Sequence, residues 1–81
     1  MDIEVKGARI VVYTTRICGY CVAAKRLLER ESLPYEEVDV SMDREKRAWL
    51  VQATGRRTVP QIFINEVPIG GYTELRSLLC P

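Results

Sequence analysis

Two cysteines three residues apart, Cys18 and Cys21, stand where an apolar run gives way to a helical pattern. This junction constrains the fold more than any other feature. The run Arg9-Ile-Val-Val-Tyr13 is short and continuous, as expected for a strand buried on both faces. From Cys21 to Arg30 the apolar residues recur at three- and four-residue spacing, which predicts an amphipathic helix that begins at the cysteine pair. Cys18 should therefore lie at the N-terminal boundary of that helix.

The middle of the chain predicts one more strand and one more helix. Leu33-Pro34 should end the first helix, because proline disfavours a helical conformation in the residue before it. A strand is then expected at 35–40 and a helix at about 42–54. Ser41 should cap this second helix and Gly55 should stop it. Trp49, Leu50 and Ala53 should line one face of this helix. Trp49 and Phe63 are expected to be core residues.

The last third of the chain predicts a hairpin followed by a short helix. Strands at 61–64 and 67–69 should turn at Asn65-Glu66, and Pro68 places the second of them at a sheet edge. Gly70-Gly71 breaks the strand, and 73–79 should be helical. The order βαβαββα predicts an α/β fold with a four-stranded mixed sheet, because the first two strands should pair in parallel through a right-handed crossover and the hairpin is antiparallel. Three helices should flank both faces of the sheet.

Length and charge exclude several classes of protein. The chain has 81 residues, so 1–81 is expected to form one small domain. It carries 12 Lys and Arg against 11 Asp and Glu, interleaved along the chain, which disfavours a nucleic-acid binder that relies on phosphate contacts. The longest apolar stretch is too short to span a membrane, and no leader-like segment opens the chain. We expect a monomeric cytoplasmic protein.

The cysteine pair itself indicates redox chemistry. Three cysteines cannot supply a secreted disulfide framework, and with no histidine the chain lacks ligands for a structural zinc site. At a helix start, N–H groups and the helix dipole favour a Cys18 thiolate, and Arg16 and Lys25 should act in the same direction. Cys21 lies one turn further along the buried face and should keep its proton. Thiol–disulfide exchange needs such a pair, in which one cysteine attacks and the other resolves.

Three motifs, in this order and spacing, resemble the glutaredoxins, a branch of the thioredoxin fold: Cys18-Gly-Tyr-Cys21, Thr58-Val-Pro-Gln-Ile-Phe-Ile64 and Gly70-Gly-Tyr-Thr-Glu-Leu75. The likeness runs from Ile10 to about Leu79. It implies a thioredoxin-like fold, a dithiol active site and a cis peptide bond before Pro60. It also implies that Val59 turns its backbone toward the cysteines, where an extended cysteine-containing peptide could pair with it by strand addition.

The resemblance further implies that this peptide is glutathione. Its γ-glutamyl end would meet Gly71, Tyr72 and Thr73, since a glycine-containing turn into a helix start offers N–H groups to a carboxylate. Thr58 belongs to the same motif as Val59, and Tyr20 would limit solvent access beside the thiolate. Cys80 fits no motif and is expected to be a peripheral thiol.

The glycine carboxylate of glutathione requires a cation. The candidates are Arg16, Arg47 and Arg57, of which Arg57 is favoured, because each guanidinium can bind a carboxylate through two hydrogen bonds. Here the sequence departs from the family pattern. Glutaredoxins usually carry Lys or Arg three residues before the first cysteine, where this chain has Thr15.

The resemblance thus implies a glutathione-dependent oxidoreductase that reduces protein disulfides and protein–glutathione mixed disulfides in cell redox homeostasis. Two alternatives stay open. One is a [2Fe-2S] carrier, in which Cys18 of two protomers and two glutathiones ligate the cluster; Gly19, where the common dithiol motif has Pro, favours it. The other is a redoxin reduced directly by a flavoprotein reductase. An inert adaptor is disfavoured by the two intact cysteines.

Overall fold

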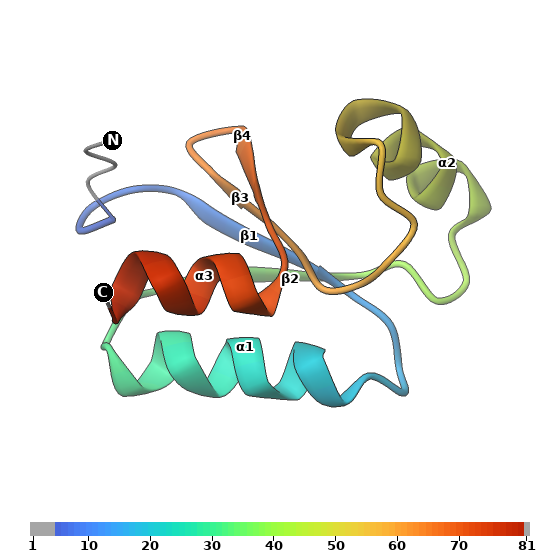
Figure 1. Ribbon diagram of the computed structural model, residues 1–81. Coiled ribbons are helices and arrows are strands. Elements are labelled where there is room, and N and C mark those ends of the chain that lie inside the picture. The colour runs from blue at the N-terminus through green and yellow to red at the C-terminus, as the bar shows by residue number, and fades with distance from the viewer. Residues whose placement is uncertain (1–4, 81) are drawn as a thin grey trace.

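A computed structural model of the protein describes residues 5–80, and the elements follow the predicted order βαβαββα (Figure 1). The ends of the elements differ from the predicted ends by at most about two residues, and the predicted layout is unchanged. The elements are β1 (Ile10–Thr14), α1 (Gly19–Arg30), β2 (Glu36–Asp39), α2 (Arg44–Thr54), β3 (Gln61–Ile64), β4 (Val67–Gly70) and α3 (Tyr72–Leu79). None of the helices in residues 5–80 has the length and apolar character needed to cross a membrane.

The four strands form one mixed sheet in the order β2-β1-β3-β4. β1 pairs in parallel with β2 and antiparallel with β3, and β4 lies at the edge beside β3. The predicted sheet is therefore confirmed. The β3–β4 hairpin turns at Asn65 and Glu66, which both have positive φ, 50° and 68°. Two such residues are the signature of the tight turn whose twist matches that of paired strands.

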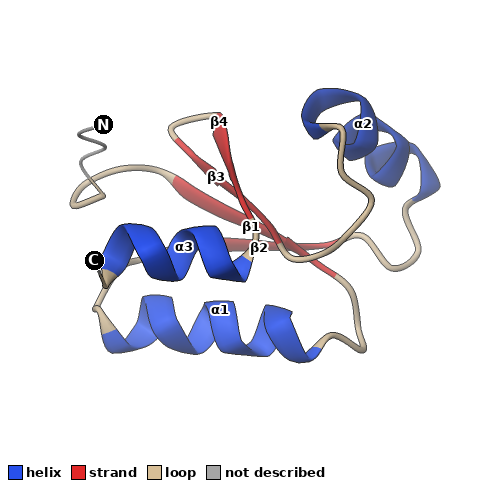
Figure 2. Ribbon diagram, in the orientation of Figure 1, coloured by secondary structure: helices blue, strands red, loops and turns tan. Residues whose placement is uncertain are grey.

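Helices cover both faces of the sheet, but unequally (Figure 2). Helices α1 and α3 lie together on one face, and α2 lies on the other. Alternate residues of β1 point to the two faces, so Ile10 and Val12 join the first core and Val11 the second. The first core has nine buried members: Ile10, Val12, Ala24, Leu27, Leu28, Leu33, Ile62, Ile64 and Leu75. The second has four: Val11, Val40, Leu50 and Phe63.

The start of α2 differs from the prediction. The helix begins at Arg44, and its N-cap is Asp43, whose carboxylate accepts the Lys46 N–H at 2.9 Å. Ser41 is therefore not the cap. Its hydroxyl oxygen instead accepts the Arg16 N–H at 2.7 Å, which ties the β2–α2 loop to the β1–α1 loop. Gly55 ends the helix as predicted, in the left-handed conformation with φ 73°.

The prediction that Trp49 belongs to the core is wrong. Trp49 is 44% exposed, Ala53 is exposed, and Leu50 is the buried residue of α2. The Trp49 ring stacks on Phe63 with 5.7 Å between ring centroids and lies beside Tyr13, so it covers the edge of the second core without entering it. Phe63 is buried, as predicted.

Candidate active site

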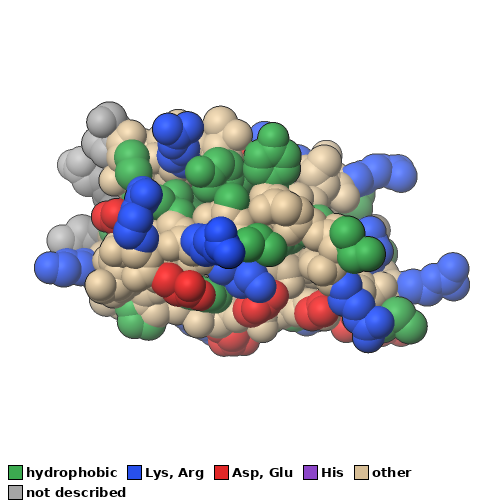
Figure 3. All heavy atoms as spheres, turned by 90° about the horizontal axis from the view of Figure 1, so that it is seen from below, with side chains coloured by type: hydrophobic (Ala, Val, Ile, Leu, Met, Phe, Trp, Pro, Cys, Tyr) green, Lys and Arg blue, Asp and Glu red, His purple; other side chains and the backbone are tan. Residues whose placement is uncertain are grey.

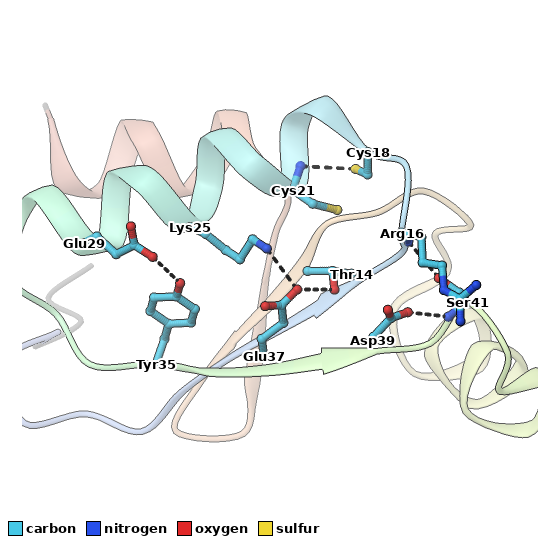
Figure 4. A network of polar contacts seen from close by, with 10 residues as sticks. All are labelled: Thr14, Arg16, Cys18, Cys21, Lys25, Glu29, Tyr35, Glu37, Asp39 and Ser41. Atoms are coloured by element: carbon cyan, nitrogen blue, oxygen red, sulfur yellow. Dashed lines mark hydrogen bonds and ion pairs between the residues drawn. The ribbon is translucent and has the colours of Figure 1, made fainter.

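Cys18 is the N-cap of α1, as predicted from the junction. Its sulfur accepts the backbone N–H of Cys21 at 3.1 Å, and the thiol donates to the Val59 carbonyl oxygen at 3.5 Å. Figure 4 shows the sulfur beside the first turn of the helix, joined by a dashed line to the Cys21 backbone nitrogen. A backbone N–H directed at sulfur, at the positive end of a helix dipole, stabilises a thiolate relative to a thiol. The geometry thus suits Cys18 to nucleophilic attack.

Cys21 has the opposite environment. Its side chain is 2% exposed and lies on the face of α1 that packs against the sheet. Burial, and next the side-chain hydrogen bond with Cys18, raise the pKa of Cys21 to about 12, while its contact with the Thr15 backbone lowers it by less. Cys21 is therefore a thiol at neutral pH, which is the state predicted for a resolving cysteine.

The charges predicted to assist Cys18 are engaged elsewhere. Lys25 donates to Glu37 Oε2 at 3.1 Å, and the buried Thr14 hydroxyl donates to the same oxygen at 2.8 Å (Figure 4). Arg16 lies on the β1–α1 loop, and its charge helps to lower the pKa of Asp39, after the larger effect of the hydrogen bonds from Ser41. Neither cation contacts the Cys18 sulfur. The polar group that contacts that sulfur from the helix is the Cys21 backbone N–H.

The peptide bond between Val59 and Pro60 is cis, as the resemblance implies. The loop that contains it borders a shallow groove of 510 Å³, whose other wall is the start of α3. Tyr20 reaches this groove from α1 and packs against Tyr72 with 5.9 Å between ring centroids. The groove is lined by Tyr20, Arg56, Arg57, Thr58, Val59, Pro60, Gly71, Tyr72 and Glu74. All the residues predicted to contact glutathione, except Arg16 and Thr73, therefore line this groove.

The three candidate cations lie in different places. Arg57 borders the groove and also an adjoining hollow of 270 Å³ next to α2. Arg47 lines that second hollow only. Arg16 lines neither, and its backbone N–H donates to Ser41 Oγ. Thr73 is exposed in the first turn of α3. Arg57 is therefore the candidate best placed to meet a ligand in the groove.

An ion pair between Arg56 and Glu74 joins the two walls of the groove, and sequence reasoning missed it. Their nitrogen and oxygen atoms are 3.0 Å apart, and the same carboxylate accepts the Gly71 N–H at 2.6 Å. These two bonds, the backbone bond first, lower the pKa of Glu74. Glu74 three residues after the helix cap is the spacing of a capping box, which was the available signal.

Gly70 and Gly71 allow this close approach. A Cβ on Gly70 would lie 2.5 Å from Glu74 Oε1, and its φ of 117° is one that other residues rarely adopt. A Cβ on Gly71 would lie 3.2 Å from the Pro60 carbonyl oxygen. The double glycine therefore ends β4 and also brings α3 against the cis-proline loop.

Cys80 lies apart from the pair. It is exposed at the C-terminal cap of α3, where Arg30 donates to its sulfur at 3.8 Å. Within residues 5–80 no three His, Cys, Asp or Glu side chains gather in a way that could hold a metal ion.

The fold and the site together define a class. A mixed sheet of this topology carries, at the start of its first helix, one partly exposed sulfur and one buried thiol opposite a cis-proline loop. These are the features of a thiol–disulfide oxidoreductase with a thioredoxin-like fold.

Comparison with known proteins specifies the family. A sequence model of the Glutaredoxin family matches residues 10–69. The glutaredoxin of Pseudomonas aeruginosa is 42% identical over 69 residues, covering 85% of this chain and 82% of that protein. A solution structure of glutaredoxin from Brucella melitensis aligns with TM-score 0.77 and 41% identity over 88% of this chain and 77% of that one. The chain belongs to the glutaredoxin family.

A further solved relative is a complex. The crystal structure of buckwheat glutaredoxin with glutathione aligns with TM-score 0.76 and 33% identity, covering 86% of this chain and 66% of the buckwheat chain.

Proposed function

We propose that the protein is a glutathione-dependent oxidoreductase that reduces protein–glutathione mixed disulfides and protein disulfides. The observation that carries the proposal is the groove beside Cys18. It is bordered by the cis-proline loop, whose Val59 carbonyl lies 3.5 Å from the Cys18 sulfur, and by the start of α3. The buckwheat relative, solved with glutathione, supports the choice of ligand.

The first reaction is removal of glutathione from a protein. The Cys18 thiolate attacks the glutathionyl sulfur, so that a Cys18–glutathione disulfide forms and the bond to the protein breaks. The protein leaves as a thiolate and takes a proton from water. A second glutathione, as its thiolate, attacks the glutathionyl sulfur on Cys18, which releases oxidised glutathione and regenerates the Cys18 thiolate.

Protein disulfides require Cys21. Attack by Cys18 on such a bond leaves a mixed disulfide between Cys18 and the partner. Cys21 then loses its proton, attacks the Cys18 sulfur and frees the partner as a second thiol. Two glutathiones later reduce the resulting Cys18–Cys21 bridge and leave as oxidised glutathione. The raised pKa of Cys21 suits this order, because Cys21 does not compete with Cys18 for the first attack.

Glutathione would lie along the groove. Its cysteine would pair with the backbone of Val59, as an added strand pairs with an exposed sheet edge. Its γ-glutamyl end would meet the start of α3 at Gly71 and Tyr72. Its glycine carboxylate would meet Arg57, which borders both the groove and the hollow beside α2.

Cysteine variants test the roles. With the mixed disulfide of glutathione and 2-mercaptoethanol as substrate, Cys18→Ser should lose activity at least about a thousandfold, because the nucleophile is gone. Cys21→Ser should keep it and should lose reduction of protein disulfides. Cys80→Ser is the matched control and should leave both activities unchanged. Turnover in Cys18→Ser would overturn the assignment.

Reductants separate glutathione dependence from direct reduction. Oxidised protein should be reduced by glutathione with glutathione reductase, and slowly or not at all by a thioredoxin-type flavoprotein reductase with NADPH. The opposite preference would favour the redoxin alternative. Mass spectrometry of the double variant Cys21→Ser, Cys80→Ser after incubation with oxidised glutathione should locate one adduct, on Cys18, because this variant lacks both the resolving cysteine and the other exposed thiol.

The alternative function, binding of a [2Fe-2S] cluster, would require a dimer. One chain offers one accessible sulfur at the site, so a [2Fe-2S] centre held by Cys18 would need two chains and two glutathiones. Gly19 leaves open space beside Cys18, since no atom lies within 4 Å of where its Cβ would be. This openness would admit a second protomer. Anaerobic reconstitution that gives no visible charge-transfer absorption and no dimer would exclude the cluster.

A further inference from the structure

Three polar side chains from three elements meet between α1 and the sheet. Thr14 ends β1, Glu37 belongs to β2 and Lys25 belongs to α1. The Thr14 hydroxyl donates to Glu37 Oε2 at 2.8 Å, and Lys25 Nζ lies 3.1 Å from the same oxygen. Thr14 is 1% exposed, so the carboxylate satisfies a hydroxyl that water hardly reaches. The steps proposed for the two active-site cysteines do not use these side chains.

The Lys25–Glu37 pair lies close to the resolving cysteine. Val38 packs in the second core, so the neighbouring Glu37 points to the opposite face of the sheet, toward α1. Lys25 follows Cys21 by four residues, which places the two side chains one turn apart on the same side of α1. Figure 4 shows the Cys21 sulfur and the Lys25 ammonium both extending from α1 toward the sheet. The ammonium that Glu37 holds is thus a cation next to the buried thiol.

Two more charged residues lie toward this end of β2. Asp39, two residues after Glu37, points to the same side of the sheet, and Arg16 lies in the β1–α1 loop. Hydrogen bonds from Ser41, and then the charges of Arg16 and Lys25, lower the pKa of Asp39. Figure 3, seen from the α1 side, shows acidic and basic side chains interspersed on this face. The field at the resolving cysteine is therefore set by individual nearby charges and not by a patch of one sign.

The resolving step creates negative charge on the Cys21 sulfur. Burial, and then Cys18, raise the pKa of Cys21, whereas the charge of Lys25 lowers it. In the mixed disulfide the Cys18 sulfur is bonded and carries no charge, so it no longer opposes ionisation of Cys21. The Lys25 ammonium, one turn away, is then positioned to offset the charge that forms on Cys21.

We propose that Lys25 assists the resolving step by stabilising the Cys21 thiolate as it forms, and that Glu37 moderates this effect by pairing with the ammonium. The inference rests on the proposed function, in which Cys21 attacks the Cys18 sulfur. In that step Cys21 releases its proton to water, a bond forms between the two sulfurs, and the bond between Cys18 and the partner breaks. The partner leaves as a thiolate. Lys25 and Glu37 are positioning residues, because they act through Cys21.

The resolving step can be followed by itself with one equivalent of 5,5′-dithiobis(2-nitrobenzoate). The Cys80→Ser variant is used, so that only the two active-site thiols react. Attack by Cys18 releases one coloured thiolate in a second-order phase. Attack by Cys21 on the resulting mixed disulfide releases the other in a first-order phase, whose rate constant does not depend on protein concentration. Cys21→Ser should remove this second phase, which assigns it to the resolving step.

Lys25→Met should slow the second phase about tenfold at pH 7, the scale of one charge lost near a partly buried sulfur. The pH dependence of that phase should shift by about one unit toward higher pH, because the thiolate has lost its cation. Lys25→Arg keeps the charge and should restore the rate and the pH profile. Glu37→Gln should have the opposite effect and speed the second phase about threefold, because it removes the anion that offsets the ammonium.

Arg26→Met is the matched control. Arg26 is next to Lys25 in the sequence, but it is exposed and lines a hollow with Tyr72 on the α3 side of α1. Its loss removes the same charge from the same helix and should leave the second phase unchanged. The first phase should be as fast in Lys25→Met as in Cys80→Ser alone, which would show that the variant is folded.

Two outcomes would overturn the inference. One is a second phase that Lys25→Met leaves unchanged. The other is equal slowing by Lys25→Met and Glu37→Gln, because loss of opposite charges with the same result would mean that the pair only holds α1 against β2. A first phase of undiminished rate in Cys18→Ser would be a different result. It would overturn the proposed function itself, and this inference with it.

Discussion

The two faces of the sheet differ in how well they are packed and in what they contribute to the active site. The hydrophobic core under α1 and α3 has nine buried members, and both helices begin at the active site, α1 at its cap Cys18 and α3 at its cap Gly71. The hydrophobic core under α2 has four buried members, and Trp49 beside it is partly exposed. The well-packed face therefore fixes the positions of the sulfur and of one groove wall. The thinner face holds α2, which contributes Arg47 to the hollow that adjoins the groove.

Replacing one core leucine on each face should give the largest difference in the free energy of unfolding between the two faces. Leu28→Ala should lower the free energy of unfolding by about 4 kcal/mol, because Leu28 is fully buried and its neighbours cannot fill the cavity. Leu50→Ala should cost about 2 kcal/mol, since Leu50 lines a hollow open to solvent and α2 can settle into the space. Urea unfolding with unchanged m-values measures both. Equal losses would contradict the difference between the faces.

Aromatic residues test the thinner face alone. Trp49→Ala should cost about 1 kcal/mol, because the ring is 44% exposed and contributes mainly its stacking on Phe63. Phe63→Ala, which empties a buried position, should cost about 3 kcal/mol or more. The same unfolding assay applies. A larger loss for Trp49 than for Phe63 would show that α2 depends on the tryptophan for its attachment.

Replacing Glu74 should change the free energy of unfolding the least, and this change should depend on pH. Its folded pKa is lowered below the ordinary 4.5, so the native state favours the carboxylate. The stabilisation is present above pH 4.5 and is lost as the pH falls through the folded pKa, because the unfolded chain takes up the proton first. Glu74→Gln should cost about 0.5 kcal/mol at pH 7, as expected for an exposed pair.

Unfolding followed from pH 7 to pH 2 checks this sign. The stabilities of wild type and Glu74→Gln should converge at the acid end, where both side chains are neutral. A constant offset over the whole range would show that the effect is one of packing and not of charge.

Local sequence signals predicted most of the fold. The continuous apolar run gave the central strand, the junction placed Cys18 at the helix cap, and Asn65-Glu66 marked the hairpin. Pro68 fell on the edge strand, as its missing N–H requires. Each of these features depends on interactions between residues that are close together in the chain. The sequence was therefore sufficient to predict them.

Tertiary contacts account for the failures. Ser41 has the chemistry of a cap, but its hydroxyl is taken by Arg16, 25 residues away. Trp49 has the hydropathy of a core residue, yet the second core is too small to enclose it. The Arg56–Glu74 pair depends on the room that Gly70 leaves for the Glu74 side chain and on how closely Gly71 lets α3 approach the cis-proline loop. Neither distance can be read from spacing along the chain.

That same ion pair has a consequence for what the groove can accept. Both partners are about half exposed, so opening the pair costs little. A ligand group with a single charge would engage one partner and leave the other unmatched. An α-amino acid group carries an ammonium and a carboxylate on one carbon, so it can replace both halves of the pair at once. The groove is thus suited to a zwitterion, whose two charges would take the place of the Arg56–Glu74 ion pair.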